Sequence, residues 1–91
     1  MRYLASENAA VSEMGDELAI LDFETDTYFS LNSTGAFLWQ LLSSPKSIEE
    51  LSAALVDEYG LSGDLAERDV TELIFDLVRV GLAKAHPDAS S

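Results

Sequence analysis

The side chains in this 91-residue sequence that could carry out chemistry are few, and their positions do not favour catalysis. The only histidine, His86, lies beside Pro87 in a polar C-terminal segment, where a general base would not be held against its target. Cysteine is absent, and no serine or threonine has a histidine or lysine partner that would activate it as a nucleophile. We therefore expect no catalytic residue and no enzymatic activity.

The many carboxylates do not have the spacing of a metal site. No Asp-x-Asp-x-Asp-Gly loop is present, although an EF-hand needs oxygen ligands at that close spacing. Asp22, Glu24 and Asp26 alternate, but they fall in a predicted hairpin turn, where polar residues are ordinary. No glycine-rich phosphate loop occurs either. We therefore expect no metal and no cofactor.

The charge of the chain excludes further classes of partner. Seventeen Asp and Glu against five Lys and Arg give a formal net charge of -12, which disfavours nucleic acid and anionic membrane surfaces. The N-terminus has no signal-peptide apolar run, and no apolar stretch approaches the ~20 residues that a membrane helix needs. With no cysteine for disulfides, we expect a cytoplasmic protein.

The elements that would position a binding site begin with extended segments. Residues 17–23 and Thr27–Leu31 are rich in aliphatic, aromatic and β-branched types, and the acidic turn between them predicts a hairpin. Residues 9–14 predict a first strand. The last strand of such a meander is an edge whose unpaired N–H and C=O groups can accept another chain. It carries Tyr28 and Phe29 and no Lys, Pro or Gly to protect it.

Helical spacing begins after residue 32. A first helix is predicted over residues 36–42, with Asn32, Ser33 or Thr34 as its cap. A second helix begins with Ser47 and Glu50, which have the spacing of a capping box, and ends at Gly60. A third helix, capped by Ser62 or Asp64 and ended by Gly81, has the clearest amphipathic pattern. Its apolar residues are Val70, Leu73, Ile74, Leu77 and Val78.

This order predicts an α+β fold, a winged helix-turn-helix with a three-stranded antiparallel sheet followed by three helices. We expect a flexible N-terminus at residues 1–8, one domain at residues 9–85 and a disordered tail at residues 86–91. A helix-turn-helix raises the question of DNA binding. Four acidic residues against two arginines on the third helix would repel phosphates, so an interaction module is the better hypothesis.

Residues 21–39 carry a resemblance to a known family. They read Leu-Asp-Phe-Glu-Thr-Asp-Thr-Tyr-Phe-Ser-Leu-Asn-Ser-Thr-Gly-Ala-Phe-Leu-Trp, which resembles the PqqD-like family, and the similarity extends over about residues 10–85. The resemblance implies a leader-peptide recognition element for ribosomally made, post-translationally modified peptides. The short free-standing chain is similar to the discrete leader-binding protein of lasso-peptide systems, which works with a separate leader peptidase and a cyclase.

The resemblance also implies where the leader binds: as an added strand beside the third strand, in a groove against the third helix. The candidate residues on the strand and its preceding turn are Asp26, Thr27, Tyr28, Phe29, Ser30 and Leu31. Those on the helix are the apolar Val70, Leu73, Ile74 and Leu77, and the acidic Asp69, Glu72 and Asp76 for basic leader residues. The partners implied are a precursor leader peptide and a maturation enzyme, with the free chain a monomer.

Three alternatives stay open on the sequence alone. The four apolar helix residues are equally explained by core packing, because a helix needs an apolar stripe to fold against its neighbours. A solvated helix face is the ordinary explanation for the three acidic residues. An acidic winged-helix adaptor in a larger enzyme or transcription complex would fit the charge and the fold without needing an open strand edge.

Overall fold

The alternating segments of the N-terminal half form a three-stranded antiparallel sheet in a computed structural model, which describes residues 1–87. The strands are β2 (Ala9–Met14), β3 (Glu17–Asp22) and β4 (Thr27–Leu31), in the order β2-β3-β4. Leu18 pairs with Leu31 and Ile20 with Phe29 across β3 and β4, so these side chains share the inner face. The predicted meander is confirmed, and β4 is an edge strand.

The turn between β3 and β4 is fixed by a buried carboxylate. Asp22 accepts hydrogen bonds from the backbone N–H groups of Glu24, at 2.9 Å, and Thr25, at 3.4 Å. Asp26 takes a positive φ of 54°, which Asp tolerates better than most residues. The Asp22 side chain therefore has a structural role in closing the hairpin.

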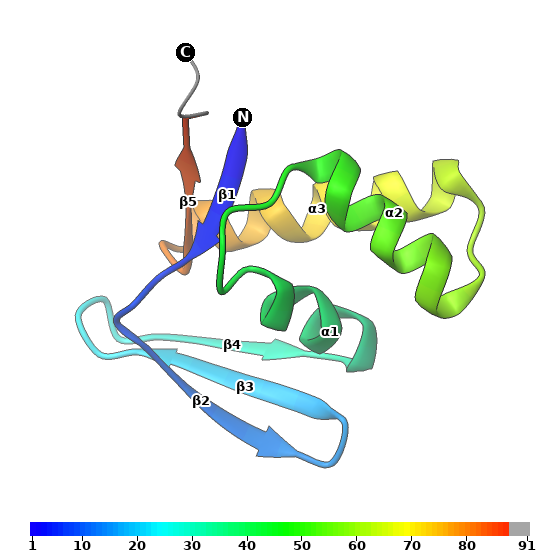
Figure 1. Ribbon diagram of the computed structural model, residues 1–91. Coiled ribbons are helices and arrows are strands. Elements are labelled where there is room, and N and C mark those ends of the chain that lie inside the picture. The colour runs from blue at the N-terminus through cyan, green and yellow to red at the C-terminus, as the bar shows by residue number, and fades with distance from the viewer. Residues whose placement is uncertain (88–91) are drawn as a thin grey trace.

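The three predicted helices are present and lie on one side of the sheet, as Figure 1 shows. They are α1 (Ser33–Leu41), α2 (Ile48–Tyr59) and α3 (Gly63–Arg79). Asn32 and Ser62 cap α1 and α3, and Gly60 ends α2 in the left-handed conformation with φ of 68°. One core forms between the helices and the sheet, with its fully buried large side chains at Ile20, Leu42, Leu51, Leu55, Val70, Leu77 and Leu82.

A second, two-stranded sheet differs from the sequence prediction. Strand β1 (Arg2–Ala5) pairs antiparallel with β5 (Ala83–His86), and the two stand together at one end of the molecule (Figure 1). Tyr3 also exchanges two backbone hydrogen bonds with Lys46. The N-terminal segment that we expected to be flexible is thus held on both sides. His86, expected in the tail, belongs to β5, whereas residues 88–91 of that tail lie outside the described residues.

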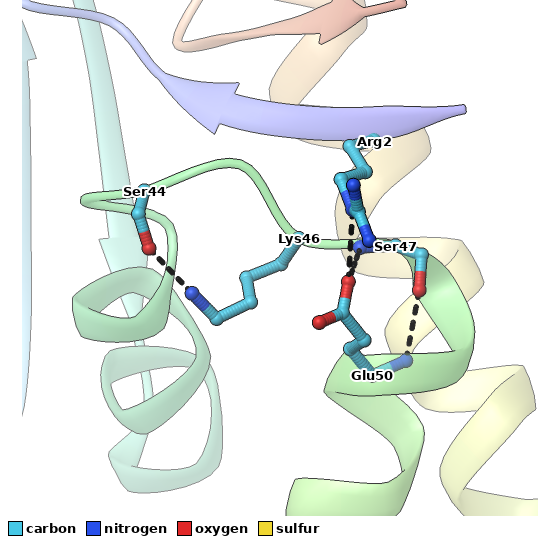
Figure 2. Close-up of polar contacts among 5 residues, drawn as sticks. All are labelled: Arg2, Ser44, Lys46, Ser47 and Glu50. Carbon is cyan, nitrogen blue, oxygen red and sulfur yellow. Dashed lines mark hydrogen bonds and ion pairs between the residues drawn. The ribbon is translucent and has the colours of Figure 1, made fainter. Parts of the chain in front are cut away.

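A capping box begins α2, as the spacing of Ser47 and Glu50 predicted. The Ser47 backbone N–H donates to Glu50 Oε1 at 3.0 Å, and the Glu50 N–H donates to Ser47 Oγ at 3.0 Å. Arg2 of β1 donates from Nε to the same Glu50 oxygen at 3.1 Å, and Figure 2 shows the three groups converging. The N–H of Ser47 and then the Arg2 guanidinium lower the pKa of Glu50 below its ordinary value of 4.5.

The lowered pKa of Glu50 predicts a pH dependence of stability. Because the folded state binds the Glu50 proton more weakly than the unfolded state, its contribution is present above pH 4.5 and is lost as pH falls through the lowered pKa. The Glu50→Gln variant should therefore unfold at a lower urea concentration than the wild type near neutral pH. On acidification, its urea midpoint should fall less than that of the wild type. Parallel pH profiles for the two proteins would contradict this assignment.

Two negative findings apply to the described part of the chain. No helix within residues 1–87 combines the length and the apolar character needed to cross a bilayer. Over the same residues, no three His, Asp or Glu side chains gather as a metal ion would require.

Candidate functional site

A groove of about 470 Å³ lies between the edge strand β4 and helix α3. Phe29, Ser30 and Leu31 line it from β4. The α3 side is lined by Asp69, Glu72, Leu73 and Asp76. The two elements that the sequence singled out, far apart in the chain, are therefore brought together around one depression.

The β4 side of the groove offers unpaired main-chain groups. Strand β4 pairs with β3 on one side, and within residues 1–87 no strand pairs with its other side. In an antiparallel strand, alternate residues direct their N–H and C=O groups to opposite edges, so about half of these groups in β4 are available to an added chain. A fourth strand placed there would continue the sheet along the groove.

The aromatic residues of β4 point to opposite faces of the sheet. Phe29 shares the inner face with buried Leu31 and lines the groove. Tyr28 is 65% exposed and lies on the outer face, and neither Thr27 nor turn residue Asp26 lines the groove. Of the six candidates on this segment, Phe29, Ser30 and Leu31 line the groove, and the inner-face side chains among them are those of Phe29 and Leu31.

The apolar candidates on α3 also divide into residues that line the groove and residues that do not. Val70, Ile74 and Leu77 are buried in the core, where they hold α3 against the rest of the molecule and do not line the groove. Leu73 is half-buried, packs against that core and faces the groove. Core packing thus explains three of the four apolar candidates, and Leu73 remains the apolar contact that α3 can offer a ligand.

The acidic residues of α3 give the groove a negative wall. Asp69, Glu72 and Asp76 lie around Leu73 on the groove-lining face. Asp76 pairs with Arg79 at 2.9 Å and Asp69 approaches Arg68 at 4.0 Å, but the two arginine side chains are largely exposed and the two carboxylates are about half exposed. Exposed pairs of this kind are worth ~0–1 kcal/mol, so a basic ligand can compete with them.

The far end of the groove includes residues that the sequence analysis did not propose as ligand contacts. They are Asn32, Thr34, Gly35, Leu38 and Leu61. The Asn32 side chain accepts the Gly35 N–H at 2.9 Å, which fixes the first turn of α1. A Cβ at Gly35 would lie 3.1 Å from Leu31 Cδ2, so glycine allows α1 to approach the end of β4 closely. The Asn-x-Thr-Gly sequence was therefore the available signal that the strand-to-helix junction forms part of the site.

The comparison with protein families identifies the chain. The model described as Coenzyme PQQ synthesis protein D (PqqD) matches residues 17–83, which span β3 to the first residue of β5. The chain belongs to the PqqD family. The match covers both walls of the groove, from β4 to α3.

Two solved structures are similar to this PqqD-family chain over nearly its whole length. TbiB1 in complex with the TbiA(beta) leader peptide is 29% identical with a TM-score of 0.81, and the match covers 93% of this chain and 99% of that one. Lasso peptide synthetase B1 complexed with the leader peptide is 26% identical with a TM-score of 0.78, covering 93% and 100%. No curated protein matches the sequence. The resemblance to the lasso type within the family is thereby confirmed.

Proposed function

We propose that this chain is a non-catalytic protein that binds the leader segment of a precursor peptide and delivers it to a leader peptidase or other maturation enzyme, in lasso-peptide or related biosynthesis. The observation that carries the proposal is the groove between an unpaired edge strand and α3. The two similar structures, each of a protein with a leader peptide, support leader binding as the function.

The leader binds as a fourth strand beside β4. Main-chain hydrogen bonds to the free edge supply affinity that depends little on sequence, and side-chain contacts in the groove supply selectivity. Because side chains of a strand alternate, every second leader residue faces the groove. The apolar surfaces that meet them are Phe29, Leu38, Leu61 and Leu73. We therefore expect apolar leader residues at alternate positions.

The acidic wall favours a leader with basic residues. Asp69, Glu72 and Asp76 should attract such a leader over a distance of about 10 Å at 0.1 M salt, chiefly by speeding association. Replacing them with Asn, Gln and Asn should slow association at low salt by roughly 3- to 10-fold and flatten its salt dependence. Stopped-flow titration of a labelled leader at several salt concentrations measures both effects.

A matched variant separates local attraction from the overall charge. Asp57, Glu58 and Glu67 are exposed and do not line the groove, so neutralising them removes the same formal charge elsewhere. This control should retain most of the wild-type salt dependence. The acidic wall would be an ordinary solvated face, with no specific attraction for the leader, in either of two cases. One is an unchanged salt dependence of association in the groove variant, and the other is an equal salt dependence in the two variants.

Delivery raises the effective concentration of precursor at the enzyme and adds no chemistry. The test is cleavage of the precursor, followed by mass spectrometry, with the chain, the peptidase or the leader omitted in turn. We expect no cleavage by the chain alone, and stimulation of the peptidase only on a substrate that carries the leader. Cleavage by the chain alone, or equal stimulation on a leaderless substrate, would refute the proposal.

We further propose that the fold is a winged helix-turn-helix whose α2 and α3 form the helical pair, and that the free chain acts as a monomer in the cytoplasm. The connection through Gly60 and the β5 strand that follows α3 support this description. The net charge of -12 opposes self-association and supports a monomer.

A further inference from the structure

We propose that the free edge of β2 and the hollow beneath it form a second binding groove, which takes an extended segment of a partner protein with two basic residues. The hollow has a volume of about 560 Å³ and lies between β2, helix α1 and the segment that joins β1 to β2. Within residues 1–87, no residue that lines it also lines the groove between β4 and α3. The inference therefore goes beyond leader recognition and assigns a second chain to the opposite edge of the sheet.

The inner face of β2 is left open by the helices. Helix α1 packs over β3 and β4, and β2 extends beyond it at the edge of the sheet (Figure 1). Val11 pairs with Ile20 across β2 and β3, so both side chains lie on the inner face. Ile20 is fully buried, whereas Val11 is 46% exposed and lines the hollow. Leu18 and Trp39, both buried, add to the apolar lining, so the hollow offers an apolar surface to a ligand.

The main chain of β2 has unpaired groups along this hollow. In the described part of the chain, β2 pairs with β3 alone, and no backbone hydrogen bond outside the sheet involves it. Met14 stands opposite Glu17 across a two-residue turn, and in such a hairpin these two residues exchange hydrogen bonds. By alternation, the N–H groups of Ala9, Val11 and Glu13 point to the free edge. The same three residues line the hollow, so inner-face side chains of a strand added to β2 would enter it.

A buried donor without an acceptor also indicates a ligand. Trp39 is 8% exposed, and its indole N–H makes no hydrogen bond among the residues that the structure describes. Buried polar groups of side chains have a hydrogen-bond partner in the large majority of cases. Because Trp39 lines the hollow, a carbonyl or hydroxyl oxygen of a bound segment can supply the missing acceptor.

The charge at the hollow specifies the segment. Glu7 and Glu13 line it toward the two ends of β2, and neither forms an ion pair within residues 1–87. No Lys or Arg occurs from residue 3 to residue 45, a stretch that contains the whole sheet. Alternate residues of an added strand face the same side, so a basic-x-apolar-x-basic segment would place its apolar residue against Val11 and its basic residues near the two glutamates. No segment of this chain has two Lys or Arg four residues apart, so a second copy does not supply the pattern.

Both edges of the sheet can be occupied at once. Strands β2 and β4 are the outer strands, with β3 between them. A leader strand held beside β4 would have to leave that edge and pass around the sheet or α1 to reach β2. The occupant of the β2 edge is therefore assigned to a separate protein and not to the leader.

The test uses Trp39 as a reporter, because it is the only tryptophan of the chain and it lines the hollow. The probe is the end-blocked peptide Thr-Arg-Thr-Val-Thr-Arg-Thr, which is titrated into the isotope-labelled chain and followed by NMR. The indole N–H resonance should move downfield as its hydrogen bond forms, and the amide resonances of Ala9, Val11 and Glu13 should move with it. The same peptide with Glu in place of Arg should cause no shift at equal concentration.

Two variants test the strand pairing and the charges separately. Val11→Pro removes a donor at the free edge and leaves the pairing with β3 intact, so the Kd for the probe should rise at least ~5-fold. Ser12→Ala keeps every donor and changes a side chain outside the hollow, so it should bind within about twofold of wild type. Glu7→Gln with Glu13→Gln should raise the Kd at least ~3-fold at low salt, and it keeps the test open if Val11→Pro does not fold.

An unmoved indole resonance, an equal shift with the Glu peptide, or wild-type affinity in folded Val11→Pro would overturn the second groove. A shift caused by the full precursor but not by its leader would assign the groove to the rest of the precursor. A shift that follows the concentration of the chain alone would assign it to a second copy, and either result would overturn the partner protein as occupant. None of these outcomes bears on leader binding at β4, which is measured separately by titration of the labelled leader.

Discussion

Leu73→Asp is expected to weaken leader binding by roughly 100-fold or more while the free protein stays folded. Leu73 is half-buried in the free chain, so a carboxylate there can still reach water. A leader strand in the groove would cover it among apolar groups and beside Asp69, Glu72 and Asp76. A charge buried without a partner costs at least ~3 kcal/mol, and each ~1.4 kcal/mol is tenfold in affinity. Titration of a labelled leader measures the loss, and circular dichroism checks the helices.

Two neighbouring substitutions control for added charge and for core disruption. Thr71→Asp adds the same charge to α3 away from the groove and should bind the leader within about threefold of wild type. Ile74→Asp puts the charge into the core and should unfold the protein, so that it loses binding and helical signal together. Wild-type affinity in a folded Leu73→Asp variant would remove α3 from the proposed site.

Proline substitutions in β4 are expected to distinguish the role of the edge that pairs with β3 from the role of the free edge. Phe29 and Ser30 are adjacent, so their N–H groups point to opposite edges, one to β3 and the other to the free side. Phe29→Pro and Ser30→Pro should therefore differ. The variant that loses the donor to β3 should destabilise the sheet, whereas the one that loses the free donor should stay folded and bind the leader at least ~10-fold more weakly. Thermal unfolding and leader titration distinguish them.

Ser30→Ala is the control for the side chain at this position. It removes the hydroxyl but keeps the main-chain N–H, so binding should remain within about threefold of wild type. If both proline variants fold and both bind with wild-type affinity, the leader does not add to β4.

Most of the fold could be predicted from the sequence because its caps and turns depend on residues that are close together in the chain. The capping box of Ser47 and Glu50 and the left-handed end of α2 at Gly60 depend on residues within one turn. The hairpin between β3 and β4 likewise depends on a four-residue turn and on side chains that alternate. The β1–β5 pair was missed because it joins the two ends of the chain, and four-residue segments carry no long-range signal of their partner.

The two elements that line the groove were predicted from the sequence, but the side chains within them that line it were predicted less well. The amphipathic stripe of α3 identifies an apolar face, but its centre packs in the core and its margin at Leu73 lines the groove. Periodicity alone does not say on which side of the stripe a groove lies. The alternation of side chains along β4 also predicts which of its two aromatic residues faces the groove. Phe29 is two residues from buried Leu31 and shares its face, which assigns Tyr28 to the opposite face.

The addition of a leader strand to β4 can be observed directly by amide hydrogen exchange. The exchange rates of the isotope-labelled chain would be measured by NMR without and with a saturating synthetic leader peptide. If the leader adds to β4, amides of alternate residues of Thr27–Leu31, those directed to the free edge, should become protected on binding, while the amides of β2 at the other edge of the sheet should keep their exchange rates. Protection of the β2 edge with no change in β4, or binding with no new protection in β4, would contradict it.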